Sequence, residues 1–261
     1  MRMKEISLEE SKKLLLEILI DIDKTCRNNN IKYSLGEGTL LGAVRHGGYI
    51  PWDDDIDILM KREDMEKFLS IYHSDRYEIY HINPDINYWN SVARISDSRT
   101  KVYFGNSINS IHGLWVALTP LDNVPDDESL WQKQKIWIAR WVKLCRQKKG
   151  VVPIDMGLKG LCERITCKLF NITFFNNQFK RIITKYNSVA TKRLCKMNIR
   201  YEPFVFPSFY FDSYQDMEFE GIKAMVISHY DEYLHQMYGD YMQLPPVEER
   251  VAKHNFRVFY K

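Results

Sequence analysis

The chain has 261 residues, of which 45% are hydrophobic and 13% aromatic, and its formal net charge is +3. This composition excludes a disordered chain and allows one sizeable core with a smaller helical appendage. No apolar run reaches the roughly 20 residues of a membrane span. The five cysteines form no CxxC pair, so neither a zinc ribbon nor a disulfide framework is predicted. We therefore expect a cytoplasmic protein.

Hydrophobic spacing predicts an alternation of helices and strands along the first sixty residues. An S-x-x-E capping box at Ser7 begins the first helix. The predicted elements, in chain order, are a helix over 7–30, a strand over 31–35, a turn over 36–38, a helix over 39–46 ended by Gly47, and a strand containing 55–58.

The rest of the chain shows the same alternation, with a long helical stretch in the middle. The predicted elements are helices over 63–72, 130–145 and 158–187, strands over 91–95, 114–118 and 218–227, and a last helix capped by Ser228 that ends at Gly239. We expect an α/β (α+β) fold, a mixed sheet flanked by helices with a basic helical insertion. The expected parts are a catalytic core over 1–125, a basic helical module over 126–200, and a segment over 201–261 that returns to the core.

The charge is unevenly distributed. Residues 126–200 carry 17 Lys and Arg against 5 Asp and Glu, a local charge of +12, whereas the remainder carries 20 against 29. Within this segment, residues 130–146 form a basic amphipathic helix with Leu130, Trp137, Ile138, Trp141, Leu144 and Cys145 on its apolar arc. This helix either contacts an anionic membrane surface or lipid-linked acceptor, or packs its apolar arc inside the protein.

Two carboxylates provide the chemistry most readily predicted. Asp55 and Asp57 are two residues apart on a predicted strand, so both side chains leave the same face of the sheet. Oxygen ligands at this spacing suit Mg²⁺ and leave positions for phosphate oxygens. The bland alternative is a solvated acidic loop, since Asp53 and Asp54 precede the pair.

A glycine-containing turn precedes these carboxylates. Gly38 and Thr39 stand between a predicted strand and the N-terminus of a short helix, where unpaired N–H groups bind anions. The Thr39 hydroxyl either binds phosphate or caps the helix. An hG[ST] turn followed by D-h-D-h is the signature of the nucleotidyltransferase fold.

Three segments resemble the LicD family, which includes bacterial phosphocholine transferases and relatives of fukutin-related protein. LGEGTLLGAVRHGGYIPWDDDIDILMKREDMEKF resembles its signature block, GLWVALTPLDNVPDD its second block, and EYLHQMYGDYMQLPPVEERVAKH its C-terminal end. The resemblance covers roughly the first 125 and last 45 residues. It implies transfer of an alcohol phosphate, most simply phosphocholine, from a CDP-activated donor to a hydroxyl of a cell-surface glycan such as teichoic acid or lipopolysaccharide, with no nucleic-acid partner.

The resemblance also implies roles for individual residues. Asp55 and Asp57 hold Mg²⁺ (or Mn²⁺), Gly38 and Thr39 cradle the donor phosphates, and Asp53 and Asp54 help to position metal or acceptor. Further candidates for contact with the donor are Arg45, His46, Arg94 and Arg99, each equally consistent with a structural role. Arg250 and His254 could close over the donor, although a lone histidine is more often structural.

One position departs from the family pattern. Ala117 stands where the second block places a third Asp, which completes the metal site or serves as base for the incoming hydroxyl in this fold. Asp122, beyond Pro120, is expected in a turn rather than as a replacement. Three functions therefore remain open: an alcohol-phosphate transferase, a nucleotidyltransferase that transfers the nucleotide itself, and a donor-binding protein impaired by Ala117.

Overall fold

A computed structural model describes residues 4–82, 90–104, 112–154, 157–196, 204–252, 254 and 256–261. The chain forms two compact units. The first contains Met1–Tyr80, Val92–Pro120 and Phe209–Lys261, and the second contains His81–Ser91 and Leu121–Ser208. Strand β7 (Trp115–Val124) begins in the first unit and ends in the second.

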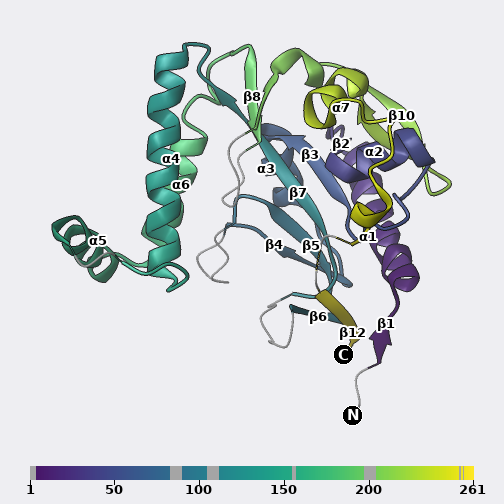
Figure 1. The fold of residues 1–261 in the computed structure, drawn as a ribbon, viewed down its shortest axis with the longest axis horizontal. Helices are drawn as coiled ribbons and strands as arrows, with labels where there is room; N and C mark the ends of the chain where they lie inside the picture. Colours follow the sequence, from purple (N-terminus) through teal and green to yellow (C-terminus); the bar gives the residue numbers. More distant parts are fainter. Residues whose placement is uncertain are drawn as a thin grey trace. The chain divides into compact units, whose positions relative to one another are not determined.

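The first unit is built on a sheet with helices around it (Figure 1). The strand order is β2 (Ser34–Leu35), β3 (Asp57–Lys61), β7, β5 (Ala93–Asp97) and β4 (Tyr77–Tyr80). The helices are α1 (Leu8–Asn28), α2 (Glu37–His46), α3 (Arg62–Ile71) and α7 (Tyr230–Tyr238). The predicted α/β class is thus confirmed.

Helix α1 supplies much of the core of this unit. The Ser7 hydroxyl accepts a hydrogen bond from the backbone N–H of Glu10 at 3.2 Å, which confirms the predicted N-cap. Four side chains at helical spacing are fully buried: Leu15, Ile18, Leu19 and Ile22. Burial of one such side chain contributes about 1.5–3 kcal/mol, so this face fixes α1 against the sheet.

A three-stranded sheet and a hairpin complete the first unit. In the sheet, β12 (Phe256–Tyr260) lies between β1 (Glu5–Ile6) and β6 (Thr100–Phe104) and is antiparallel to both. The predicted strand over 218–227 is instead a hairpin of β10 (Tyr214–Phe219) and β11 (Ile222–Ile227). Glu220 and Gly221 both have positive φ, which gives the two-residue turn that favours antiparallel pairing.

Several other predicted boundaries were wrong. Helix α2 begins at Glu37, so Gly38 lies in the first helical turn rather than in a loop. Strand β3 begins at Asp57, so Asp55 lies just before it, and β2 contains only two residues. Ser228 does not cap α7, whose N-cap is His229.

The second unit is mainly helical. Its elements are α4 (Glu128–Lys148), α5 (Leu158–Leu169), α6 (Ile172–Ile183), β8 (Arg193–Lys196) and β9 (Phe204–Pro207). The predicted single helix over 158–187 breaks at Phe170, whose backbone is extended, and restarts where Asn171 caps α6. No described helix is long and apolar enough to cross a membrane. Short 3₁₀ turns occur at Ser208–Phe211, where the chain returns to the first unit, and at Val247–Glu249 within the first unit.

The apolar arc predicted on α4 is divided between core and surface. Ile138, Leu144 and Cys145 are buried in a cluster with Cys167 of α5 and with α6 side chains, whereas Leu130 and Trp137 are 43% and 50% exposed. Most of the arc therefore packs inside the second unit, which is one of the two outcomes that the sequence left open.

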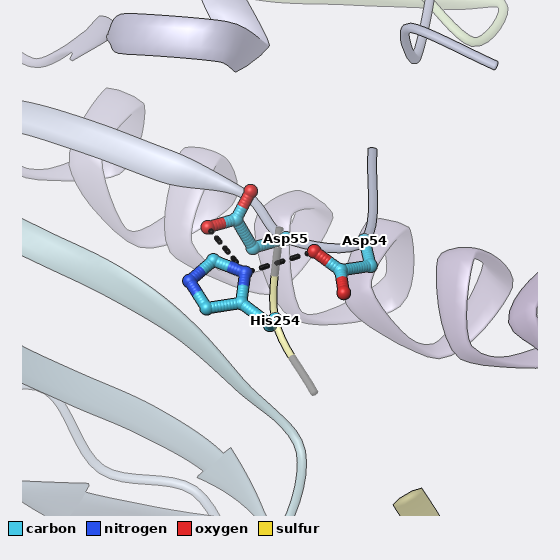
Figure 2. A group of neighbouring side chains, drawn as sticks. All are labelled: Asp54, Asp55 and His254. Carbon is cyan, nitrogen blue, oxygen red and sulfur yellow. Dashed lines mark hydrogen bonds and ion pairs between the residues drawn. The ribbon is translucent and has the colours of Figure 1, made fainter. Parts of the chain in front are cut away.

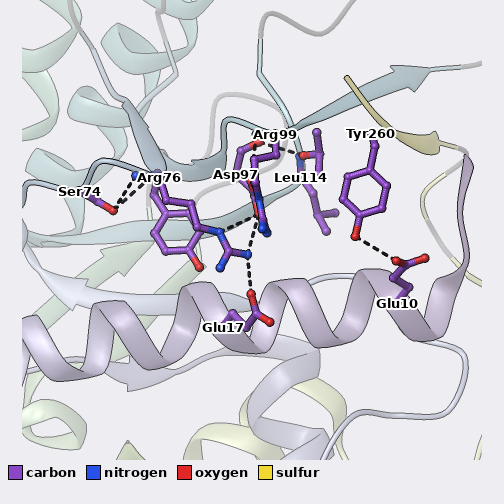
Figure 3. A network of polar contacts seen from close by, with 10 residues as sticks. Glu10, Glu17, Ser74, Arg76, Asp97, Arg99, Leu114 and Tyr260 are labelled. Carbon is purple, nitrogen blue, oxygen red and sulfur yellow. Dashed lines mark hydrogen bonds and ion pairs between the residues drawn. The ribbon is translucent and has the colours of Figure 1, made fainter. Parts of the chain in front are cut away.

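A buried carboxylate ties the first unit together around α1 (Figure 3). The fully buried Asp97 accepts hydrogen bonds from Arg99 Nη2 at 2.7 Å and Arg76 Nη2 at 2.9 Å, and Arg76 also contacts Glu17 of α1. Burial alone raises the pKa of Asp97, but the hydrogen bonds from both guanidinium groups outweigh it, so the net pKa is lowered.

We expect Asp97→Asn to lower the free energy of unfolding by about 3 kcal/mol, because it leaves two guanidinium groups without their buried counter-charge. A lowered folded-state pKa means that this stabilisation is present above about pH 4 and lost as the pH falls further. Urea unfolding at pH 7 and pH 3 measures both effects. The control is Asp75→Asn, whose side chain is fully exposed; equal stability of the two variants at pH 7 would contradict the assignment.

Candidate active site

The signature segment is closed by hydrogen bonds between the start of α2 and the start of β3. The Gly36 N–H donates to the Asp57 carbonyl at 2.9 Å, and the Asp57 N–H donates to the Thr39 hydroxyl at 2.9 Å. Thr39 is 3% exposed, so its hydroxyl joins α2 to β3 instead of capping the helix. The hG[ST] turn therefore positions the acidic strand.

Gly38 allows the acidic loop to approach α2. A Cβ atom at this position would lie 2.6 Å from Asp53 Oδ2, closer than non-bonded atoms come. Any other residue at position 38 would thus displace the Asp53 carboxylate from the first turn of the helix. The glycine expected beside a donor phosphate also determines where a carboxylate lies.

Asp54, Asp55 and His254 form a cluster before β3 (Figure 2). His254 Nδ1 lies 2.9 Å from Asp54 Oδ1 and 3.6 Å from Asp55 Oδ2, although 200 residues separate His254 from Asp54. One ligand atom of each residue lies within 4.8 Å of the others. The group does not include Asp57, which the sequence predicted as the second metal ligand.

The cluster concentrates negative charge in partly buried surroundings. Burial and the neighbouring Asp53 raise the pKa of Asp55 to about 7, while the hydrogen bond with Asp54 raises the pKa of His254. A divalent cation would relieve the repulsion among these carboxylates. Two carboxylate oxygens and one imidazole nitrogen suit Mn²⁺ or, with more oxygen ligands added, Mg²⁺. The donor set fits the metal that the sequence implies.

Ala117 lies on the strand next to these acids. Its N–H donates to the Ile56 carbonyl at 3.0 Å, between Asp55 and Asp57 in the chain. Ala117 is half-buried like both acids, while its neighbours Val116 and Leu118 are fully buried like Ile56. This alternation indicates that position 117 shares the face of the two carboxylates, as the alignment with the second family block predicted.

Aromatic side chains that the sequence did not single out line the same region. Arg94, the register partner of Ala117, lies with its guanidinium 4.1 Å from the centroid of the Trp115 ring and contacts His112. The Trp115 and Phe256 rings are 5.7 Å apart, and Phe256 lies 5.7 Å from the His254 ring. The sequence could have indicated this aromatic lining at Trp115. This residue lies two positions before Ala117, so strand alternation places both side chains on the same face of the sheet.

The remaining cationic candidates contact the C-terminal block. Arg45 Nη1 donates to the Tyr241 carbonyl at 2.7 Å, across 196 residues. Arg250 lies 5.7 Å from the Trp52 ring, whose other neighbour is His46 at 6.4 Å. These contacts bring the signature and C-terminal blocks of the family together in space.

Two further residues have their contacts outside the cluster. The Arg99 guanidinium donates two hydrogen bonds to Asp97, as part of the network in Figure 3. A diphosphate bound by Arg99, as the sequence predicted, would have to compete with Asp97 for this guanidinium. Asp122 is fully buried in β7, within the second unit, and accepts a hydrogen bond from Asn187 at 2.6 Å. It lies in a strand rather than in the expected turn, and it is no replacement for a carboxylate at position 117.

The raised pKa of Asp55 predicts a pH-dependent effect of Asp55→Asn. In metal-free protein the raised folded-state pKa makes the Asp55 carboxyl destabilising from about pH 4 upward and fully so above about pH 7. The variant should therefore melt a few degrees higher at pH 8 and identically below about pH 4. Mn²⁺ should raise the melting temperature of the parent more than that of the variant. The exposed Asp212→Asn serves as control, and an unchanged Mn²⁺ response in Asp55→Asn would argue against metal at this cluster.

Comparison with known proteins places these features in one family. Residues 30–143 match the family described as LicD/FKTN/FKRP, nucleotidyltransferase domain. The chain is 30% identical, over 97% of both chains, to the lipopolysaccharide cholinephosphotransferase LicD of Haemophilus influenzae. Shorter matches reach uncharacterized proteins of Rickettsia typhi, 45% identical over 27% of this chain and 23% of the relative, and Rickettsia prowazekii, 52% identical over 19% of each. The chain belongs to the LicD family.

Proposed function

We propose that this protein is a LicD-type transferase that moves phosphocholine from a CDP-activated donor to a hydroxyl group of a cell-surface glycan. The observation that carries the proposal is the cluster of Asp54, Asp55 and His254, which three separated sequence blocks of the family surround. The full-length similarity to a lipopolysaccharide cholinephosphotransferase supports the substrate class. Whether that glycan is lipopolysaccharide or teichoic acid is a finer choice that the acceptor assay decides.

The chemistry assigned to the site is an in-line displacement at phosphorus. The acceptor oxygen forms a bond to the phosphorus that carries the alcohol, the bond from that phosphorus to the bridging oxygen breaks, and CMP leaves while the hydroxyl proton passes to a base. Bound Mg²⁺ or Mn²⁺ would neutralise charge on the donor diphosphate. Asp54, Asp55 and His254 would hold it, each with one ligand atom.

The aromatic side chains beside the cluster favour choline over an uncharged alcohol. A quaternary ammonium group binds over ring faces, best over Trp. The Trp115 ring binds one cation, the Arg94 guanidinium at 4.1 Å from its centroid. The Phe256 ring lies 5.7 Å from both the Trp115 ring and the His254 ring, so these aromatic rings adjoin the cluster. An alternative reading, transfer of the nucleotide itself, would release diphosphate in place of CMP.

The first test is a donor panel of CDP-choline, CDP-ribitol and CDP-glycerol incubated with Mg²⁺ or Mn²⁺ and a glycan acceptor. Mass spectrometry should detect CMP and a phosphocholine-modified acceptor, and release should fall at least about 10³-fold in the double variant Asp54→Asn, Asp55→Asn. The exposed Asp212→Asn variant should keep parent activity. A second arm replaces the CDP-alcohols by CTP; diphosphate release there, with a CMP-modified acceptor, would replace this proposal by nucleotidyl transfer.

The second test restores the carboxylate at position 117. Ala117→Asp should raise the rate of CMP release by about 10² to 10⁴, the usual contribution of a positioned general base, with little change in donor affinity. The metal-free variant should melt slightly lower than the parent because a further like charge joins the cluster. If the parent binds donor without turnover and Ala117→Asp restores turnover, the parent is a donor-binding protein impaired by Ala117. Equal rates in both forms would mean that position 117 has no catalytic role.

A further inference from the structure

Helix α5 carries an apolar stripe on its surface. Leu161, Ile165 and Leu169 follow one another at intervals of four residues and are 48%, 48% and 72% exposed. At 100° per residue they span an arc of about 80°, so they form one continuous face. Phe170, directly after the helix, is 39% exposed and extends this face.

The opposite face of α5 is fixed to the second unit. Cys167 is buried in the helical core, and Glu163 receives hydrogen bonds from Lys143 Nζ at 2.9 Å and Gln147 Nε2 at 2.7 Å. The helix is therefore held through Glu163 and Cys167, while Leu161, Ile165 and Leu169 face outward. This is the reverse of the usual orientation of an amphipathic helix in a water-soluble protein.

The exposed surface of α4 leads to the same region. Ile136 and Arg140 precede Lys143 and Gln147, the residues that contact α5, by seven positions each and so lie on the same side of α4. Ile136 is 68% exposed. Beside it Trp137, 50% exposed, stacks with Arg140 at 5.3 Å.

The charge of this region is strongly positive. Residues 157–196 contain nine Lys and Arg and a single acid, Glu163, which forms an ion pair with Lys143. Lys168 on α5 is exposed beside the stripe, as is Arg140 on α4. An apolar face bordered by cations is complementary to a surface that is anionic outside and apolar within.

We propose that α5, together with the exposed side of α4, docks on the surface of an anionic lipid bilayer. The stripe of Leu161, Ile165 and Leu169 enters the boundary between head groups and acyl chains, and the bordering cations contact acidic head groups. Trp137 lies at the interface, where its ring is favoured. The lipid-facing surface thus differs from the arc predicted on α4, most of which is core. The inference needs no turnover and stands apart from the proposed reaction.

Vesicle partitioning tests the proposal with the full chain. Co-sedimentation should be strong with vesicles of phosphatidylcholine and phosphatidylglycerol, weak with phosphatidylcholine alone, and reduced by raising NaCl from about 0.1 to 0.5 M. Leu169→Gln should weaken partitioning about tenfold, because an apolar side chain that enters the bilayer is lost. The matched control is Val247→Gln in the first unit, which has the same 72% exposure and should change nothing.

Insertion into the bilayer is measured at Cys162. All five cysteines are among the residues that the structure describes, and Cys162 is exposed whereas the other four are buried. A polarity-sensitive fluorophore attached there, beside the stripe, should shift to shorter wavelength on addition of anionic vesicles. Circular dichroism checks that the variants remain folded. The absence of vesicle binding would overturn the proposal. Sedimentation experiments that show a dimer in the parent and a monomer in Leu169→Gln would also overturn it, since a second copy of the chain would then cover the stripe.

Discussion

Mutual repulsion among the carboxylates of Asp53, Asp54 and Asp55 is the constraint around which the site is organised. The three acids follow one another before β3, and Asp55 is sufficiently desolvated that its pKa rises to about 7. The surrounding structure holds them there by different means: Gly38 leaves room for Asp53, the Thr39 hydroxyl fixes the start of the strand, and His254 bridges the other two acids. Such an arrangement opposes folding unless a cation neutralises it, a requirement that the metal proposed for this cluster would meet.

The parts of this site that the sequence predicts are those with local signals. Alternation of Ile56 and Ile58 with Asp55 and Asp57 placed both acids on one face, and the small glycines marked the close approach of α2. The position of Ala117 followed from the resemblance to a family block. The contribution of His254 did not, because a lone histidine 200 residues from its partner carries no periodic or spacing signal. Resemblance of the C-terminal block named Arg250 and His254 as candidates for donor contact, but not the contact of His254 with the acids.

Errors in the fold have similar physical origins. The break at Phe170 was missed because the apolar spacing continues across it, while Asn171, a capping residue, was the available signal. The hairpin over β10 and β11 was read as one strand, although Glu220 and Gly221 interrupt it. Tertiary packing determines which apolar face stays exposed: it buries most of the α4 arc and leaves the apolar stripe of α5 exposed.

The pairing of β1 with β12 joins segments that are far apart in the chain, so these parts of the first unit come together late in folding. Glu5 of β1 lies opposite Phe259 of β12, and Arg45 and Asp54 find their partners about 200 residues further along the chain. Contacts of such high sequence separation form late in folding, since the loop between them must close first. The acidic cluster is therefore completed only when the segment that carries His254 has folded onto the signature segment, so its geometry depends on parts of the first unit that are far apart in the chain.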